Sequence, residues 1–397
     1  MQPAAPQPPR EFPPYISYLM VTVMSVALLS MQAAVPFKVK QLGGGFDAVG
    51  FLFTWTSCWY IASGLILGRI AHQAGPRRVM LVSLAICAAL VFALSATTAL
   101  WQLYAVLAAY FVSICMFWSA AEHASTGMHS RLTLVQSTAI YCVSFSLGNG
   151  VGLLIGTGLQ RQTLTVPFII AAGLTLVVWV LTWWTVSPQA GFHRSSPEDI
   201  AAFSETDRQR LQRSLLLARI GIVGAYGAYA VVTVFLPRYL CDCRGLSKPV
   251  AGGLTSLTQF VMAATFALHG RWTNWPHRRL PVRLAPLIGA AGLLIVCWTT
   301  QPVVIALGAM VIGAVAATSY AHNLYYALEE PGHRARRAGI HEALIGIAYL
   351  LPAVLSGWAA RWTNNPQSVF WVGAALALAA AAVQTLVLRN RSNAVGI

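Results

Sequence analysis

The chain has 397 residues, of which 57% are hydrophobic and only 9% are charged, and its formal net charge is +15. A soluble globular chain has about a quarter of its residues charged, so this composition excludes a water-soluble fold of this length. The chain has no Gly-x-x-x-x-Gly-Lys-[Ser/Thr] loop, no His-Glu-x-x-His and no Gly-x-Ser-x-Gly elbow. We therefore expect no enzyme of the classes that those motifs mark, and no cofactor or metal.

The chain begins with a proline-rich segment, residues 1–14, for which we expect a disordered tail. Glu11 flanks the first apolar run, which is long enough to remain as a membrane span, so a cleaved secretory signal is not expected. Further runs follow, each close to the 20 or so residues that cross a bilayer as a helix. They lack the alternation of barrel strands, which leaves helices as the structure that satisfies the backbone in lipid. The twelve predicted spans are 15–36, 47–68, 79–98, 100–123, 137–159, 164–186, 216–237, 250–270, 284–300, 302–326, 338–360 and 367–388.

The second half of the chain repeats a feature of the first. Two basic loops begin 202 residues apart, one running from Gly68-Arg69 to Arg77-Arg78 and the other from Gly270-Arg271 to Arg278-Arg279. A membrane chain built from two similar halves usually holds a substrate path between them. We therefore predict an all-α fold of two pseudo-symmetric six-helix bundles, 15–186 and 216–388, with a central cytoplasmic loop at 187–215 and a cytoplasmic tail at 389–397.

The polar stretch between the halves contains two possible helix starts, at Ser196-Pro197 and at Ser204-Glu205. The arginines that follow Ser204 suit a short surface helix near lipid headgroups, while a plain solvated connector is the simpler interpretation. Earlier in the chain, three glycines recur four residues apart on the fifth span. They share one helix face and predict close packing against a neighbouring helix, with a gating role as the alternative; they are Gly148, Gly152 and Gly156.

The placement of the basic residues indicates topology rather than nucleic-acid binding. With the N-terminus inside, 19 arginines fall on the inner face and 7 lysines and arginines on the outer face. This is the positive-inside asymmetry of membrane proteins. We expect a multi-pass protein, with both termini cytoplasmic, of a bacterial inner membrane.

Taken together, the twelve spans in two halves, the central loop and the repeated basic loops resemble the major facilitator superfamily. The family's loop has Gly, three residues, Asp and then basic residues, and here His72 and Asn274 stand where the acidic residue is usual. The chain lacks the motifs of the drug–proton antiporters. The resemblance implies two bundles that rock about a central site by alternating access. It makes the loop residues candidate gating residues: Gly68, Arg69, His72, Arg77, Arg78, Gly270, Arg271, Asn274 and Arg278.

Two acidic residues lie within or at the edge of predicted spans. Inserting a charged side chain at the bilayer centre costs about 2.5–3.5 kcal/mol, so such a residue needs an ionic partner, contact with water or a functional role. Glu342 shares a small polar face of the eleventh span with Gly339 and Gly346, and His341 is its neighbour. Glu342 is a candidate for binding a cation, a proton or the substrate; a salt bridge to Arg336 or Arg337 is the alternative.

Glu122, at the end of the fourth span, shares a face with Trp118 and is a second candidate for titration, unless it is a solvated helix end. The tenth span carries His322, Asn323, Tyr325 and Tyr326. Aromatic faces with a few polar groups suit small organic ligands, so we predict that these residues shape a pocket; interfacial tyrosines are the alternative. Gln32, Tyr226, Tyr229 and Gln259 are lesser candidates, and so are Trp55, Trp59 and Tyr60.

These features together favour a secondary transporter that moves a small organic solute. Two carboxylates and histidines within spans favour proton coupling, and uniport stays open. The alternative function is a non-transporting membrane sensor or assembly partner with a transporter-like fold. The expected partners are a small-molecule substrate, the lipid bilayer and protons, with no nucleic acid, and a monomer is expected.

Overall fold

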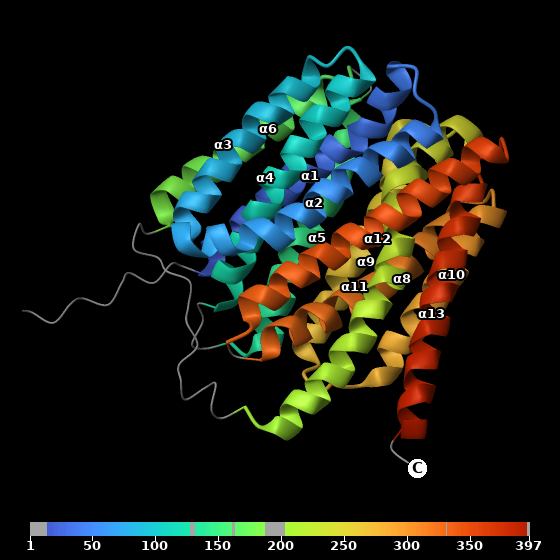
Figure 1. Ribbon diagram of the computed structural model, residues 1–397. Helices are drawn as coiled ribbons and strands as arrows, with labels where there is room; N and C mark the ends of the chain where they lie inside the picture. The colour runs from blue at the N-terminus through green and yellow to red at the C-terminus, as the bar shows by residue number, and fades with distance from the viewer. Residues whose placement is uncertain (1–13, 128–131, 161–162, 187–202, 331, 395–397) are drawn as a thin grey trace, which may run out of the picture.

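The computed structural model describes residues 14–127, 132–160, 163–186, 203–330 and 332–394. Within these ranges it contains twelve helices, all long and apolar enough to cross a membrane, which confirms the predicted all-α fold (Figure 1). The helices are α1 (Pro14–Gln41), α2 (Phe46–Ala74), α3 (Pro76–Ser95), α4 (Leu100–Gly127), α5 (Leu134–Leu159), α6 (Val166–Thr185), α8 (Glu205–Arg244), α9 (Lys248–Arg271), α10 (Arg279–Trp298), α11 (Pro302–Glu329), α12 (Arg334–Trp362) and α13 (Ser368–Ala394).

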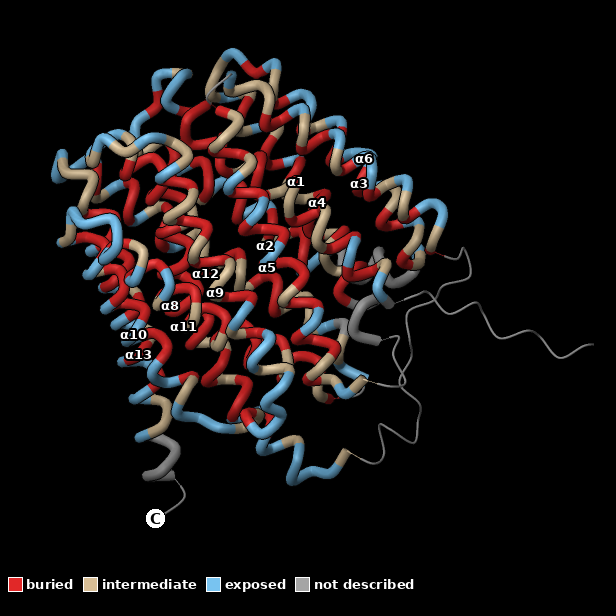
Figure 2. Tube along the Cα trace, turned by 180° about the vertical axis from the view of Figure 1, so that it is seen from behind, coloured by how far each residue is buried: buried red, intermediate tan, exposed pale blue. Residues whose placement is uncertain are grey.

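The helices form two groups, α1–α6 and α8–α13, which lie side by side (Figure 1). Buried residues line the interior of both groups, and exposed residues follow the outer helices (Figure 2). Large apolar side chains such as Trp184 and Trp298 are exposed on this outer surface, as a lipid environment requires. We name the two ends of the bundle by their residues: the lysine end carries Lys38, Lys40 and Lys248, and the arginine-rich end carries Arg77 and Arg278.

The glycine face on α5 packs against α1, as its spacing predicts. A Cβ added at Gly152 would lie 2.6 Å from the carbonyl oxygen of Val26, and Gly148 and Gly156 meet the α1 backbone one turn away on either side. The close approach allows the Ser30 hydroxyl to donate a hydrogen bond to the carbonyl of Gly152 at 3.2 Å. Small residues are what let two membrane helices approach this closely.

The first predicted basic loop is largely helical, which corrects its boundaries, whereas most of the second is a turn. α2 continues to Ala74 and α3 begins at Pro76, so Gly75 alone connects them, with a φ of 81° that favours glycine. In the second half, α9 ends at Arg271 and the turn runs to Arg278. Apolar runs mark the lipid-embedded part of a helix, and helices extend beyond it into the polar zone.

α8 also begins earlier than its apolar run predicts. The Ser204 side chain caps the helix by accepting a hydrogen bond from the backbone N–H of Asp207 at 3.1 Å, which confirms the cap predicted from sequence. The segment after it is one continuous helix with the seventh span, not a separate surface helix. Arg208 binds Glu330 at 3.2 Å, and this ion pair anchors the extension to the loop between α11 and α12. The other possible start, at Ser196, lies outside the described residues.

The two helix groups meet along α2–α12 and α5–α9, and glycines bring these helices into contact. Toward the lysine end, a Cβ added at Gly357 would lie 3.0 Å from the Cα of Gly50. Toward the arginine-rich end, one added at Gly339 would lie 3.0 Å from the carbonyl oxygen of Gly64. The two helix groups are therefore in contact near both ends of the α2–α12 pair.

Candidate functional site

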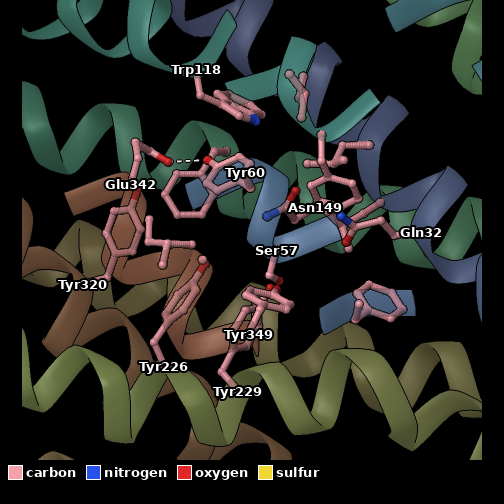
Figure 3. Close-up of a pocket in the computed structure, with 18 of the residues that line it drawn as sticks. Gln32, Ser57, Tyr60, Trp118, Asn149, Tyr226, Tyr229, Tyr320, Glu342 and Tyr349 are labelled. Atoms are coloured by element: carbon pink, nitrogen blue, oxygen red, sulfur yellow. Dashed lines mark hydrogen bonds between the residues drawn. The ribbon is translucent and has the colours of Figure 1, made fainter. Parts of the chain in front are cut away.

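A cavity of about 110 Å³ lies between the two helix groups, with room for several water molecules. Aromatic side chains from both groups dominate its wall, together with a few polar ones (Figure 3). The lining residues are Leu28, Leu29, Gln32, Phe53, Ser57, Tyr60, Phe111, Ile114, Trp118, Tyr141, Phe145, Asn149, Tyr226, Tyr229, Tyr320, Glu342, Ile345, Gly346 and Tyr349.

Glu342, one of the two carboxylates predicted from sequence, faces this cavity from α12 and is 3% exposed. The hydroxyl of Tyr60 on α2 donates a hydrogen bond to its Oε2 atom, so this contact joins the two helix groups. Neither alternative ion pair forms: Arg337 binds Glu330, and Arg336 is exposed whereas Glu342 is buried. Gly346 lies one turn away on the same face and lets Ile61 of α2 approach.

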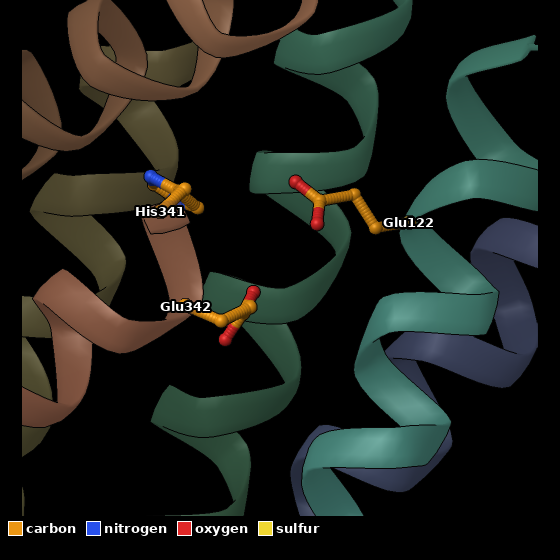
Figure 4. Close-up of side chains that lie close together, drawn as sticks. All are labelled: Glu122, His341 and Glu342. Atoms are coloured by element: carbon orange, nitrogen blue, oxygen red, sulfur yellow. The ribbon is translucent and has the colours of Figure 1, made fainter. Parts of the chain in front are cut away.

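Glu122 and His341 adjoin Glu342, although neither lines the cavity (Figure 4). One donor atom from each of the three side chains lies within 4.8 Å of the other two, and all three residues are buried. The Nδ1 atom of His341 is 2.6 Å from the side-chain Nδ2 atom of Asn323. The Nε2 atom of His341 has no hydrogen-bond partner. Two carboxylates and an imidazole in one buried cluster are suited to holding a positive charge, whether a proton or a cation.

A second set of aromatic residues forms the wall opposite α2. The rings of Tyr226 and Tyr229 on α8 are 4.7 Å apart, and Tyr226 also lies 5.6 Å from Tyr320 on α11. Gln259 of α9 donates a hydrogen bond to the Tyr229 hydroxyl, which fixes that ring. Tyr226, Tyr229 and Gln259 are lesser candidates from sequence, and the structure places the two tyrosines in the wall.

Among the other predicted residues, Gln32 and Trp118 line the cavity. Asn323 does not line it, but it orients His341 beside Glu342. Asn149, which follows Gly148 on α5 and lines the cavity, is not among the residues predicted from sequence. Asn149 could have been found from the sequence, because it is a polar residue inside an apolar span and has a glycine on either side.

The aromatic face of α11 lies elsewhere, which corrects the predicted pocket. His322, Tyr325 and Tyr326 share one helix face as predicted, but none of them lines the cavity. They pack toward the arginine-rich end, where the His322 ring lies 4.5 Å from that of Trp275. The Tyr326 hydroxyl accepts a hydrogen bond from the backbone N–H of His277 at 2.8 Å. This cluster joins α11 to the turn between α9 and α10.

The candidate gating residues occupy the arginine-rich end. Arg77 donates a hydrogen bond to the carbonyl of Trp183 at 3.0 Å and also stacks on that ring. A Cβ added at Gly270 would lie 2.7 Å from the Cβ of Ala139 on α5, so this glycine lies at a contact between the two groups. Arg78, Arg271, Asn274 and Arg278 are exposed or at the turn, and the side chains of Arg69 and His72, with Gly68, lie outside the described residues.

The lysine end carries an ionic closure that the sequence analysis did not predict. Arg238 of α8 is 5% exposed, and its guanidinium donates to the carbonyls of Gly44 at 3.1 Å and Gly45 at 3.0 Å, in the turn between α1 and α2. Asp242 accepts from Arg238 at 3.1 Å and from Lys40 at 2.6 Å. The bonds from Arg238 to the turn and from Lys40 to Asp242 cross between the helix groups, while the Arg238–Asp242 pair lies within α8.

Replacing Arg238 with glutamine should open the lysine end. Charge-assisted hydrogen bonds contribute about 1.5–3 kcal/mol each, so losing them should raise cavity access by about tenfold or more. The measurement is labelling of a Gln32→Cys variant by a maleimide that cannot cross the bilayer, applied to each side in turn. Cys58 and Cys243, which are exposed, are first replaced by serine.

The matched control is Arg361→Gln. Arg361 pairs with Asp47 at 3.4 Å across the same end, but its side chain is 70% exposed, and such surface pairs contribute little. Labelling should stay unchanged in this variant. Unchanged labelling in Arg238→Gln as well would refute the closure.

Comparisons with known proteins agree with this architecture. The model of the Major Facilitator Superfamily matches residues 16–333. Among solved structures, the nucleoside transporter NupG superposes with a TM-score of 0.71 at 14% identity, covering 94% of this chain and 98% of that one. The human organic anion transporter MFSD10 gives 0.66 at 15% identity, over 95% and 100%. A bacterial homolog of the human lysosomal transporter Spinster gives 0.72 at 12% identity, over 95% and 96%.

No curated protein matches the chain. At the identities of the solved structures, the likeness establishes the fold and leaves the solute open.

Proposed function

The chain belongs to the major facilitator superfamily, and on that premise we propose that it is a secondary transporter that carries a small organic solute through the central cavity by alternating access. The position of the cavity is the observation that carries this proposal. Phe53 and Tyr60 reach it from one helix group, and Tyr226 and Tyr349 from the other. Transporters built from repeats bind their substrates at such an interface.

The proposed orientation puts the arginine-rich end and both chain termini in the cytoplasm of a bacterial cell, with the protein in its inner membrane. The asymmetry of basic residues supports this orientation. On this assignment, the Arg238 closure is the external gate.

Proton coupling is the finer part of the proposal, and the cluster around Glu342 supports it. Two buried carboxylates within 4.8 Å repel each other, so taking up a proton relieves the repulsion. A carboxylate that becomes accessible from each side of the membrane in turn would carry that proton across the membrane. The ionisable groups around Glu342 are Tyr60 on α2, Cys115 and Glu122 on α4, Tyr141 on α5, Tyr226 on α8, Tyr320 on α11 and His341 on α12.

The test is flux into vesicles that contain the purified protein. Radiolabelled uridine, tyramine and benzoate are offered in turn, with and without an imposed pH gradient, so that a nucleoside, an amine and an organic anion are each represented. Flux of at least one probe above that of protein-free vesicles is expected, and the pH gradient should increase it. Binding without flux of any probe would instead support the sensor function.

A further inference from the structure

Resting on the proposed transport function, we infer that the solute is a protonated amine with a flat apolar body and a hydrogen-bond donor at its far end. Three independent features of the cavity carry this inference: the sign of its charge, the rings of its wall and an acceptor without a partner.

The charge of the cavity is negative whenever Glu342 is ionised. Glu342 is the only carboxylate among the described residues that line it, and that lining contains no lysine, arginine or histidine. Glu122 lies behind Glu342 and adds a second carboxylate to the same region. An anionic solute would meet repulsion here without compensation, whereas an ammonium group would form a charge-assisted hydrogen bond with Glu342.

The wall beside this carboxylate consists of aromatic rings. Tyr60 and Phe111 lie 6.2 Å apart on one side, and Tyr226 lies 5.6 Å from Tyr320 on the other. Ring faces attract cations and stack on flat apolar groups. The amine should therefore be attached to an aromatic or similarly flat body.

The opposite part of the cavity offers a hydrogen-bond acceptor. The Oδ1 atom of Asn149 is buried and has no hydrogen-bond partner, and Asn149 is 7% exposed. In Figure 3, Asn149 and Gln32 lie on the far side of Tyr60 from Glu342. Because buried acceptors are rarely left unsatisfied, a donor on the solute is expected at this position.

The experiment compares four small probes on the purified protein by calorimetric titration in detergent. Tyramine has the ammonium, the ring and the distal hydroxyl. 4-Ethylphenol lacks the ammonium, 3-(4-hydroxyphenyl)propionate replaces it with a carboxylate, and phenethylamine lacks the hydroxyl. Tyramine should bind about ten- to a hundredfold more tightly than 4-ethylphenol, the range for a charge-assisted contact, and the propionate should not bind.

Two variants assign these preferences to residues. In Glu342→Gln, the advantage of tyramine over 4-ethylphenol should disappear, and in Asn149→Ala, tyramine and phenethylamine should bind equally. Glu205→Gln, which removes an exposed carboxylate at the start of α8, is the control and should keep every ratio. Comparing ratios within one variant cancels losses of general stability.

The inference is overturned if the propionate binds as tightly as tyramine, if the advantage of tyramine persists in Glu342→Gln, or if none of the probes binds. None of these outcomes would contradict the proposed transport function, which is tested separately by the flux of any solute into vesicles. Absence of flux for every probe, with binding intact, would refute transport and leave the chemistry of the cavity standing.

Discussion

Replacing Glu342 with glutamine should abolish flux driven by a pH gradient, for whichever probe the unaltered protein carries. Glutamine keeps the size of the side chain and can still accept the hydrogen bond from Tyr60, but it cannot take up a proton or pair with an ammonium group. Flux should fall to the level of protein-free vesicles. A pH-sensitive dye inside the vesicles should record no proton movement when solute is added.

Glu122→Gln is the comparison that assigns the role. Glu122 belongs to the same cluster but does not line the cavity, so flux should survive in this variant. Glu205→Gln controls for the loss of a carboxylate far from the cluster. Full proton-driven flux in Glu342→Gln would rule out Glu342 as the coupling group, although it would leave transport through the cavity intact.

Replacing Gly152 with valine should strongly destabilise the folded protein. The new Cβ would lie 2.6 Å from the carbonyl oxygen of Val26 and 3.0 Å from the Cβ of Leu29, so α1 and α5 would have to separate. Overpacking of this kind costs about 3 kcal/mol, and a backbone carbonyl cannot move aside as a side-chain end can. The expected result is a lower melting temperature in detergent and less folded protein from the membrane.

Gly158→Val is the matched control, because Gly158 lies on the same helix with nothing within 4 Å of an added Cβ. Both variants introduce the same side chain into α5, so a difference of several kcal/mol between them reports packing against α1. Equal melting temperatures would contradict the role of the glycine face.

The spans and the glycine face follow directly from the sequence, because lipid requires long apolar helices and close packing requires small residues. The ends of the helices do not. α8 extends from Ser204 into a stretch of arginines, where hydropathy falls although the helix continues. Apolar composition therefore predicts where the membrane is rather than where a helix begins.

The site was predictable only in part, and the tenth predicted span shows why. Helical spacing correctly groups His322, Tyr325 and Tyr326 on one face, but it does not say which neighbour that face contacts. In the same way, Tyr60 follows the exposed Trp55 and Trp59 in sequence and yet points inward to Glu342. Contacts between residues as far apart as 60 and 342 depend on how the two halves are placed, which no local pattern records.

The guanidinium of Arg238 donates hydrogen bonds to main-chain carbonyls in the turn between α1 and α2, and it also lies over the Phe46 ring, 4.7 Å from its centroid. Carbonyl oxygens are present whatever residue occupies a position, so these two hydrogen bonds depend on the path of the backbone, which needs glycine at Gly43, where φ is 84°, and little space beside Gly44. Paired substitutions between Arg238 and residues 44 and 45 are therefore not expected, and Asp242 on α8 is its side-chain partner. Insertions or deletions between residues 41 and 46 should therefore disturb the gate more than substitutions do.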